Sequence, residues 1–210
     1  MRILTATGAL LAVLAFSSAA LADKPGYFVA PHVGVLVPQL ATELDSSVVF
    51  GLELGYVVPV DMGGFVRPLG FEFDVMGTLP GASGGGTSEQ LGEDGGTYDY
   101  DVRVTMVILE LTASWRFDIT DIVGVYVQAG PRAYFIQTTV DASSGTADFG
   151  RRTQGDNAFG GVFAVGGDLT LGPGAVFLAA EYAGSDLKTR LAGDANTGAL
   201  AFDLGYRIRF

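Results

Sequence analysis

The chain contains no cysteine and only one histidine, His32, among its 210 residues. The lack of cysteine excludes disulfides, thiol catalysis and zinc–thiolate sites. Basic residues are also scarce, because 12 Lys and Arg stand against 23 Asp and Glu and give a net charge of −11. Binding to a phosphate backbone needs basic patches, so we expect no nucleic-acid partner.

Long apolar runs are missing too, apart from residues 3–21, although 49% of the chain is hydrophobic. Arg2, this run and the Ala-Leu-Ala ending at residues 20–22 have the order of a secretory signal peptide. An uncleaved membrane anchor is the alternative, and the small residues followed at once by charged and turn-forming ones disfavour it. We therefore predict Sec-type export, a cleaved signal peptide over residues 1–22, and one domain over residues 23–210.

Hydrophobicity in this domain repeats with a period of two residues, which is typical of strands with one apolar and one polar face. In the segment 198–210, aliphatic or aromatic residues occupy alternate positions, and small or charged residues lie between them. The same pattern recurs along the chain. It predicts eight strands, at residues 27–37, 47–58, 65–79, 100–117, 123–140, 158–171, 175–186 and 198–210.

The predicted connections alternate between long polar segments and short turns. The long ones are 38–46, 80–99, 141–157 and 187–197, and the short ones are 59–64, 118–122 and 172–174. Long loops at one end, with tight turns and both chain ends at the other, are the layout of outer-membrane barrels. A soluble β-sandwich would show the same alternation with its apolar face turned inward.

The aromatic residues of the apolar parity separate these two alternatives. If they face outward they form two belts, as expected for a barrel that crosses two membrane interfaces, whereas a sandwich core would gather them in the middle. The turn-end belt consists of Tyr27, Tyr56, Phe65, Trp115, Phe117 and Phe210, and the loop-end belt of Phe50, Phe135, Phe159, Tyr182 and Phe202. We therefore predict an all-β fold, an eight-stranded antiparallel up-and-down transmembrane β-barrel in the bacterial outer membrane.

The ending at Phe210 and the glycine-rich segment 124–135 resemble strands of the small eight-stranded outer-membrane barrels of OmpA/OmpX type. The resemblance covers residues 23–210 as an architecture, and no peptidoglycan-binding domain is expected after it. It implies outer-membrane lipids, lipopolysaccharide, periplasmic chaperones and the barrel-assembly machinery as partners, and it leaves the oligomeric state open. The assembly signal that it implies consists of Leu204, Tyr206, Ile208 and Phe210.

The polar parity points into the lumen, which in an eight-stranded barrel is just wide enough for its own side chains. An unpaired buried ion costs on the order of several kcal/mol, so charges there must pair. At the middle we place Arg132 among carboxylates. The predicted network, which plugs the lumen, consists of Glu53, Glu110, Arg116, Arg132, Asp168, Glu181, Asp203 and Arg207, with Glu53, Glu110 and Glu181 around Arg132. The other inward polar residues are His32, Glu72, Asp74, Gln128 and Arg209.

Three functions are compatible with such a barrel. A structural or surface-interaction role, in membrane integrity or adhesion, is favoured because the lumen is expected to be full. A narrow porin-like channel for ions or small solutes is the alternative, and the excess of inward acids would favour cations. A lipid A-modifying enzyme is disfavoured, because it needs a serine nucleophile beside a base on the lipid-facing surface. His32 has the inward parity instead, and no serine follows two positions on.

The glycine-rich segments carry no ligand-binding signature. Gly84-Gly85-Gly86 leads into no helix and lacks a following Lys-Ser/Thr, so it does not bind phosphate as a loop. Acidic glycine segments lack the ligand spacing of a calcium loop. We therefore expect no enzyme activity, metal or cofactor. Within strands, glycine allows close packing, and Pro131 in mid-strand predicts a local irregularity or a bulge.

Overall fold

The computed structural model describes residues 26–38, 44–58, 66–88, 96–144, 147–189, 193–196 and 198–210. The predicted signal peptide lies outside the described residues. No helix in the described part of the chain is long and apolar enough to cross a membrane. The strands are β1 (Tyr27–Pro38), β2 (Ser47–Val57), β3 (Val66–Thr78), β4 (Gly81–Ser88), β5 (Gly96–Asp118), β6 (Val123–Ser144), β7 (Ala147–Leu171), β8 (Gly174–Thr189), β9 (Gly193–Asn196) and β10 (Ala199–Arg209).

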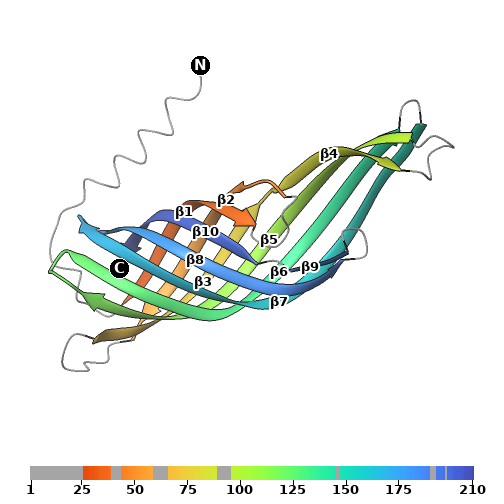
Figure 1. Ribbon diagram of the computed structural model, residues 1–210. Coiled ribbons are helices and arrows are strands. Elements are labelled where there is room, and N and C mark those ends of the chain that lie inside the picture. Colours follow the sequence, from red (N-terminus) through yellow and green to blue (C-terminus); the bar gives the residue numbers. More distant parts are fainter. Residues whose placement is uncertain are drawn as a thin grey trace, which may run out of the picture.

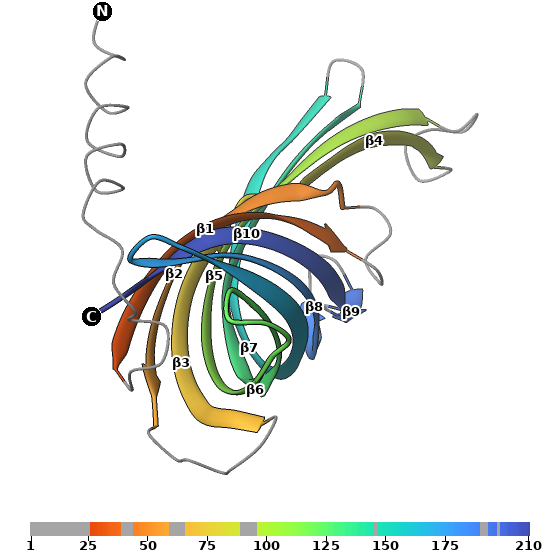
Figure 2. The same cartoon turned by 90° about the vertical axis from the view of Figure 1, so that its left-hand side faces the viewer.

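The strands form one antiparallel sheet that closes on itself (Figures 1 and 2). Hydrogen-bonded neighbours follow the order β10-β1-β2-β3-β5-β6-β7-β8, and β8 pairs with β10 to complete the ring. Within the described ranges, eight strands therefore make the ring, while β4 pairs with β5 and β9 pairs with β8. The prediction of an eight-stranded antiparallel up-and-down barrel is confirmed.

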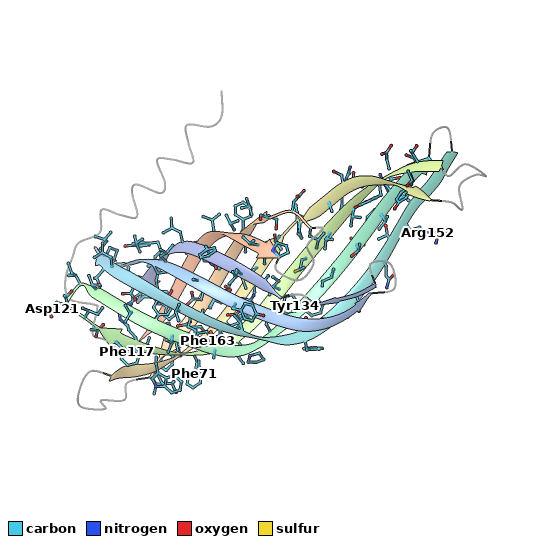
Figure 3. The ribbon with its side chains drawn as sticks, in the orientation of Figure 1. Phe71, Phe117, Asp121, Tyr134, Arg152 and Phe163 are labelled. Carbon is cyan, nitrogen blue, oxygen red and sulfur yellow. The ribbon has the colours of Figure 1, made fainter. Side chains whose placement is uncertain are left out.

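The ring is apolar on its outer wall and polar in much of its interior. On β1, Val33 and Val35 are 43% and 45% exposed, whereas the positions between and beside them are buried. In Figure 3, Phe71 and Phe163 stand on the outer wall, while Tyr134, which is buried, belongs to the interior. A β-sandwich would bury its aromatic and aliphatic residues, so this arrangement supports the barrel instead.

Aromatic residues predicted for the two belts do lie on the outer wall. Tyr27 and Tyr56 face each other across β1 and β2, with ring centroids 4.7 Å apart. Phe117 is half-buried, and the side chain of Phe65 lies outside the described residues. The exposed members are Tyr27, Tyr56, Trp115 and Phe210 at the turn end and Phe50, Phe135, Phe159, Tyr182 and Phe202 at the loop end.

Three of the predicted long loops are wrong in part, because strands occupy much of them. In the segment 80–99, β4 is present and β5 already begins. In the segment 141–157, β6 continues and β7 starts at Ala147, and in 187–197 β8 continues and is followed by β9. Backbone pairing goes on here beyond the ring, in segments rich in glycine and polar residues. Both faces of a strand meet water beyond the ring, so no row of lipid-facing apolar residues marks such a strand in the sequence.

The additional pairing builds a sheet that projects from the loop end of the ring on one side (Figure 1). We call it the outer extension. It consists of β4 and of the paired residues 96–103 of β5, 139–144 of β6 and 147–153 of β7.

Pro131 interrupts the ladder between β5 and β6, as predicted. Glu110 pairs with Arg132 and Ala113 with Ala129, but the two positions between them on each strand are not paired. Pairing resumes in the same register, so the irregularity is not a bulge. The missing N–H of proline accounts for part of the gap.

Gly160 and Gly161 are neighbours on β7 and face opposite sides of the wall. A Cβ atom added at Gly160 would lie 2.0 Å from the carbonyl oxygen of Gly184 on β8, whereas one added at Gly161 would meet nothing closer than 3.7 Å. Gly160→Ala must push the two strands apart, and we expect it to lower the free energy of unfolding by about 1–3 kcal/mol. Gly161→Ala should change it by less than about 0.5 kcal/mol. Urea titrations of both refolded variants measure the difference, and equal effects would contradict the close strand approach.

Candidate functional site in the barrel lumen

The alternation of side chains along each strand carries the predicted network into the lumen. Arg116 is partly exposed near the turn end, with 19% of its side chain accessible. The structure places every predicted member on the inside, while their function stays a prediction. The buried members are Glu53, Glu110, Arg132, Asp168, Glu181, Asp203 and Arg207, and His32, Glu72, Asp74 and Gln128 are buried with them.

Arg132 forms the first centre of this network. Its Nε donates to Glu110 Oε2 at 2.6 Å, and its Nη2 donates to Glu181 Oε2 at 2.5 Å and also contacts Glu110. The three side chains come from β6, β5 and β8, and that of Arg132 is only 2% exposed. One guanidinium thus joins two carboxylates in a site removed from water, where charge-assisted hydrogen bonds are strong.

Glu53 belongs to a second centre, so its predicted place beside Arg132 was wrong. Its Oε1 accepts a hydrogen bond at 3.0 Å from Nη2 of Arg207. Strand order explains the difference: Glu53 on β2 lies two strands from Arg207 on β10 but three strands from Arg132 on β6. All of these side chains share the inward parity, and only the ring order decides which of them meet.

Aromatic rings surround the guanidinium of Arg207. Its Cζ atom lies 4.7 Å from the ring centroid of Phe28, 5.3 Å from that of Tyr126 and 5.0 Å from that of Phe177. These distances are within the range of cation–π attraction. Sequence reasoning missed this aromatic cage because it assigned aromatic residues to the outer belts. The sequence did contain a sign of the cage, because Phe28, Tyr126 and Phe177 have the same parity as the inward charged residues of their strands.

The network continues toward the turn end through Arg116. Its Nη2 lies 2.7 Å from Asp168 Oδ1, and its Nε donates to Asp118 Oδ1 at 2.8 Å. Asp168 also lies 3.8 Å from Nη1 of Arg207. The arginine-centred groups at Arg116 and Arg207 therefore share one carboxylate.

His32 lies beside carboxylates near the middle of the lumen. Its Nε2 is 3.1 Å from Asp74 Oδ2, and its Nδ1 is 3.8 Å from Asp203 Oδ1. Glu72 accepts hydrogen bonds from Ser114, at 2.8 Å, and from Gln128. Glu72 and Asp74 were recognised as inward residues in the sequence but were not included in the predicted network.

These polar side chains leave little free space. A cavity of about 10 Å³ remains between His32, Glu72, Asp74, Glu110, Asp203 and their neighbours. That volume corresponds to about one water molecule. No group of three or more histidines and acids among the described residues has an arrangement suited to a metal ion.

An apolar cluster fills the loop-end part of the lumen, so charged side chains are not its whole filling. Ile108 is fully buried, and Tyr134 is 2% exposed. The sequence prediction missed this layer because both faces of the strands are apolar at this height. The layer consists of Leu36, Val49, Met76, Val104, Met106, Ile108, Tyr134, Ile136, Ala158 and Ala199.

Comparison with known families agrees with this architecture. The family described as "Outer membrane protein beta-barrel domain" matches residues 8–207, and the chain belongs to that family. The protein is accordingly located in the bacterial outer membrane. A comparison with curated proteins gives no significant match.

Solved structures of bacterial outer-membrane proteins are similar to this chain. OprG from Pseudomonas aeruginosa is 12% identical with a TM-score of 0.50, and the match covers 90% of this chain and 97% of OprG. Ail, the attachment invasion locus protein of Yersinia pestis, is 16% identical with a TM-score of 0.38 and coverages of 89% and 99%. Neisserial surface protein A is 16% identical with a TM-score of 0.43 and coverages of 88% and 97%. At such identities the likeness concerns the fold alone.

Proposed function

We propose that the protein is a non-enzymatic barrel with a structural or surface-interaction role, such as membrane integrity or adhesion. The observation that carries this proposal is the filled lumen. Arg132 and Arg207 are each held by carboxylates, and the cavity beside them measures about 10 Å³. The apolar cluster adds a second layer toward the loop end. A solute would have to displace both layers, whereas the outer extension is free to meet the surroundings of the cell.

The same proposal includes the partners of biogenesis and of the membrane. Leu204 and Phe210 are 51% and 72% exposed on the outer wall. This exposure supports the proposal that the barrel-assembly machinery recognises them, together with Tyr206 and Ile208, as the assembly signal. Outer-membrane lipids would contact this wall, and lipopolysaccharide its loop-end rim. Sec-type export with periplasmic chaperones and cleavage after residue 22 complete the proposal. The mass of the purified membrane form tests the cleavage site.

The surroundings of His32 support a structural role for the histidine. Its side chain is 3% exposed and faces Asp74 inside the lumen. A base that modifies lipid A would have to reach a lipid on the outer wall. We infer that no such chemistry occurs at His32.

A narrow cation channel is the second candidate function. The observation in its favour is the charge of the cavity, because six carboxylates line it: Glu53, Glu72, Asp74, Glu110, Glu181 and Asp203. Two arginines, Arg132 and Arg207, contact members of this set. Any ion that crossed would meet an excess of negative charge, and the apolar layer would still oppose it.

Planar-bilayer recording of the refolded protein distinguishes the two candidates. We expect no steady open-channel conductance, because passage requires displacement of both layers. A porin reconstituted in the same bilayers shows that the recording detects open barrels, and heat-dependent gel mobility shows that the sample is folded. Steady conductance would contradict the plugged lumen, and its reversal potential in a salt gradient would then report whether cations are preferred.

A further inference from the structure

The two faces of the outer extension differ in charge. The face that continues the outer wall carries two ion pairs, Asp101 with Arg103 at 2.8 Å and Asp141 with Arg151 at 3.2 Å. The face that continues the lumen parity, here called the inner face, carries Arg152 of β7, which is labelled in Figure 3. Its other residues on β5 and β6 include Tyr98, Tyr100, Val102, Val140 and Ala142.

Two tyrosines of the inner face lean across β4. Tyr100 pairs with Gly84 and Tyr98 with Gly86. A Cβ atom at either glycine would lie 2.7 Å from the hydroxyl oxygen of the partner tyrosine, so the rings occupy the space that side chains on β4 would fill. The ring centroids are 6.3 Å apart and the ring planes are 29° from parallel. The glycines at positions 84 and 86 thus give room to these rings.

The described neighbours of the two rings on this face are small and uncharged. Tyr100 faces Ala142 on its other side, and both tyrosines remain partly exposed. Between the two glycines, Gly85 gives room to Asp99, whose carboxylate lies on the opposite face. Among the described side chains of the extension, the carboxylates of Asp99, Asp101 and Asp141 therefore lie on one face and the two tyrosine rings on the other.

This arrangement has the chemistry of a sugar-binding surface. Tyrosine offers a large, rigid, amphipathic contact area at a low entropic cost. The C–H groups on one face of a pyranose ring can pack on an aromatic ring, and sugar hydroxyls can bond the phenolic oxygens, which donate and accept. Among the side chains that the structure describes, no carboxylate lies beside the rings on this face, and Arg152 lies on the same face. This charge pattern suits neutral or acidic sugars rather than a cationic partner.

We propose that Tyr98 and Tyr100 form a platform on the outer extension that binds a glycan through stacked pyranose rings. The proposal rests on the proposed surface-interaction function, and it names the chemical class of the partner. Gly84 and Gly86 hold the platform open, because any side chain there would displace the rings.

Binding of the full-length barrel in nanodiscs to an array of immobilised neutral and acidic oligosaccharides tests the platform. We expect wild-type protein to bind at least one oligosaccharide, with the affinity then measured by calorimetric titration. Tyr98→Ala with Tyr100→Ala should weaken that affinity at least tenfold, because both stacking faces are lost. Gly84→Ala with Gly86→Ala should weaken it as well, although both rings are retained.

Tyr182→Ala is the matched control, because Tyr182 is 53% exposed on the outer wall and away from the platform. It should leave the affinity unchanged, and heat-dependent gel mobility verifies that each variant is folded. An absence of oligosaccharide binding by the wild type, or equal binding by the variant without the two tyrosines, overturns the platform. Those outcomes leave the conductance result untouched, so failure of the platform and failure of the proposed function are distinguishable.

Discussion

Replacing Arg132 with Met is expected to lower the free energy of unfolding by about 3–5 kcal/mol, because it leaves buried carboxylates without their cation. Glu110 and Glu181 would both lose the guanidinium that now bridges them at the centre of the lumen. Urea-induced unfolding of the barrel in detergent micelles or lipid vesicles, followed by the gel mobility of the folded form, measures the change.

Two control variants separate burial from charge. Adding Glu110→Gln and Glu181→Gln to Arg132→Met removes the unpaired charges, so most of the lost stability should return. Arg103→Met removes an ion pair with Asp101 whose side chains are 74% and 44% exposed, and it should cost less than about 1 kcal/mol. A loss for Arg132→Met as small as that for Arg103→Met would show that the lumen is wetter than the structure indicates.

Leu178→Arg, on the outer wall, is expected to lower the free energy of unfolding by about 2–4 kcal/mol. Leu178 is 60% exposed on β8, between Leu204 of β10 and Gly167 of β7, and lies within the apolar wall between the two belts. A guanidinium at this position would have to stay in hydrocarbon. Equilibrium unfolding from lipid vesicles measures the loss.

The control for this change is Leu79→Arg. Leu79 is 72% exposed, but it lies between β3 and β4, where the chain enters the outer extension. An arginine there meets water, so the free energy of unfolding should stay within about 0.5 kcal/mol of wild type. Similar losses at Leu178 and Leu79 would contradict the position of the apolar wall between the two belts.

The ring itself could be predicted from the sequence because one physical constraint acts on every strand. Lipid outside and packed polar groups inside impose a period of two, and positions such as Val33 and Val35 on β1 record it directly. The outer extension was not predicted from the sequence, because no such constraint acts on strands beyond the lipid. Thr139 and Thr153 meet across β6 and β7 on the face that continues the outer wall, where the ring carries apolar residues instead. Strands with polar residues at these positions resemble loops in composition.

The composition of the lumen was predictable, but its contacts were not. Parity places Glu53, Arg132 and Arg207 inside, whereas the choice of partner depends on the order of strands around the ring and on side-chain reach. The apolar layer could have been predicted from the run between Val104 and Leu109, where residues on both faces are largely apolar. Such a run means that the wall has an apolar filling behind it at that height.

The pairing of β1 with β10, here called the seam of the ring, has a consequence for membrane insertion. Phe28 on β1 is paired with Arg209 on β10, so the strands at the two extremes of the ring's chain order are direct neighbours. Until they pair, the sheet has two open edges whose N–H and C=O groups have no partner in hydrocarbon. Entry into the bilayer and closure of the seam must therefore be one event. Damage to β10 should prevent accumulation of the whole barrel in the membrane rather than loosen one edge of it.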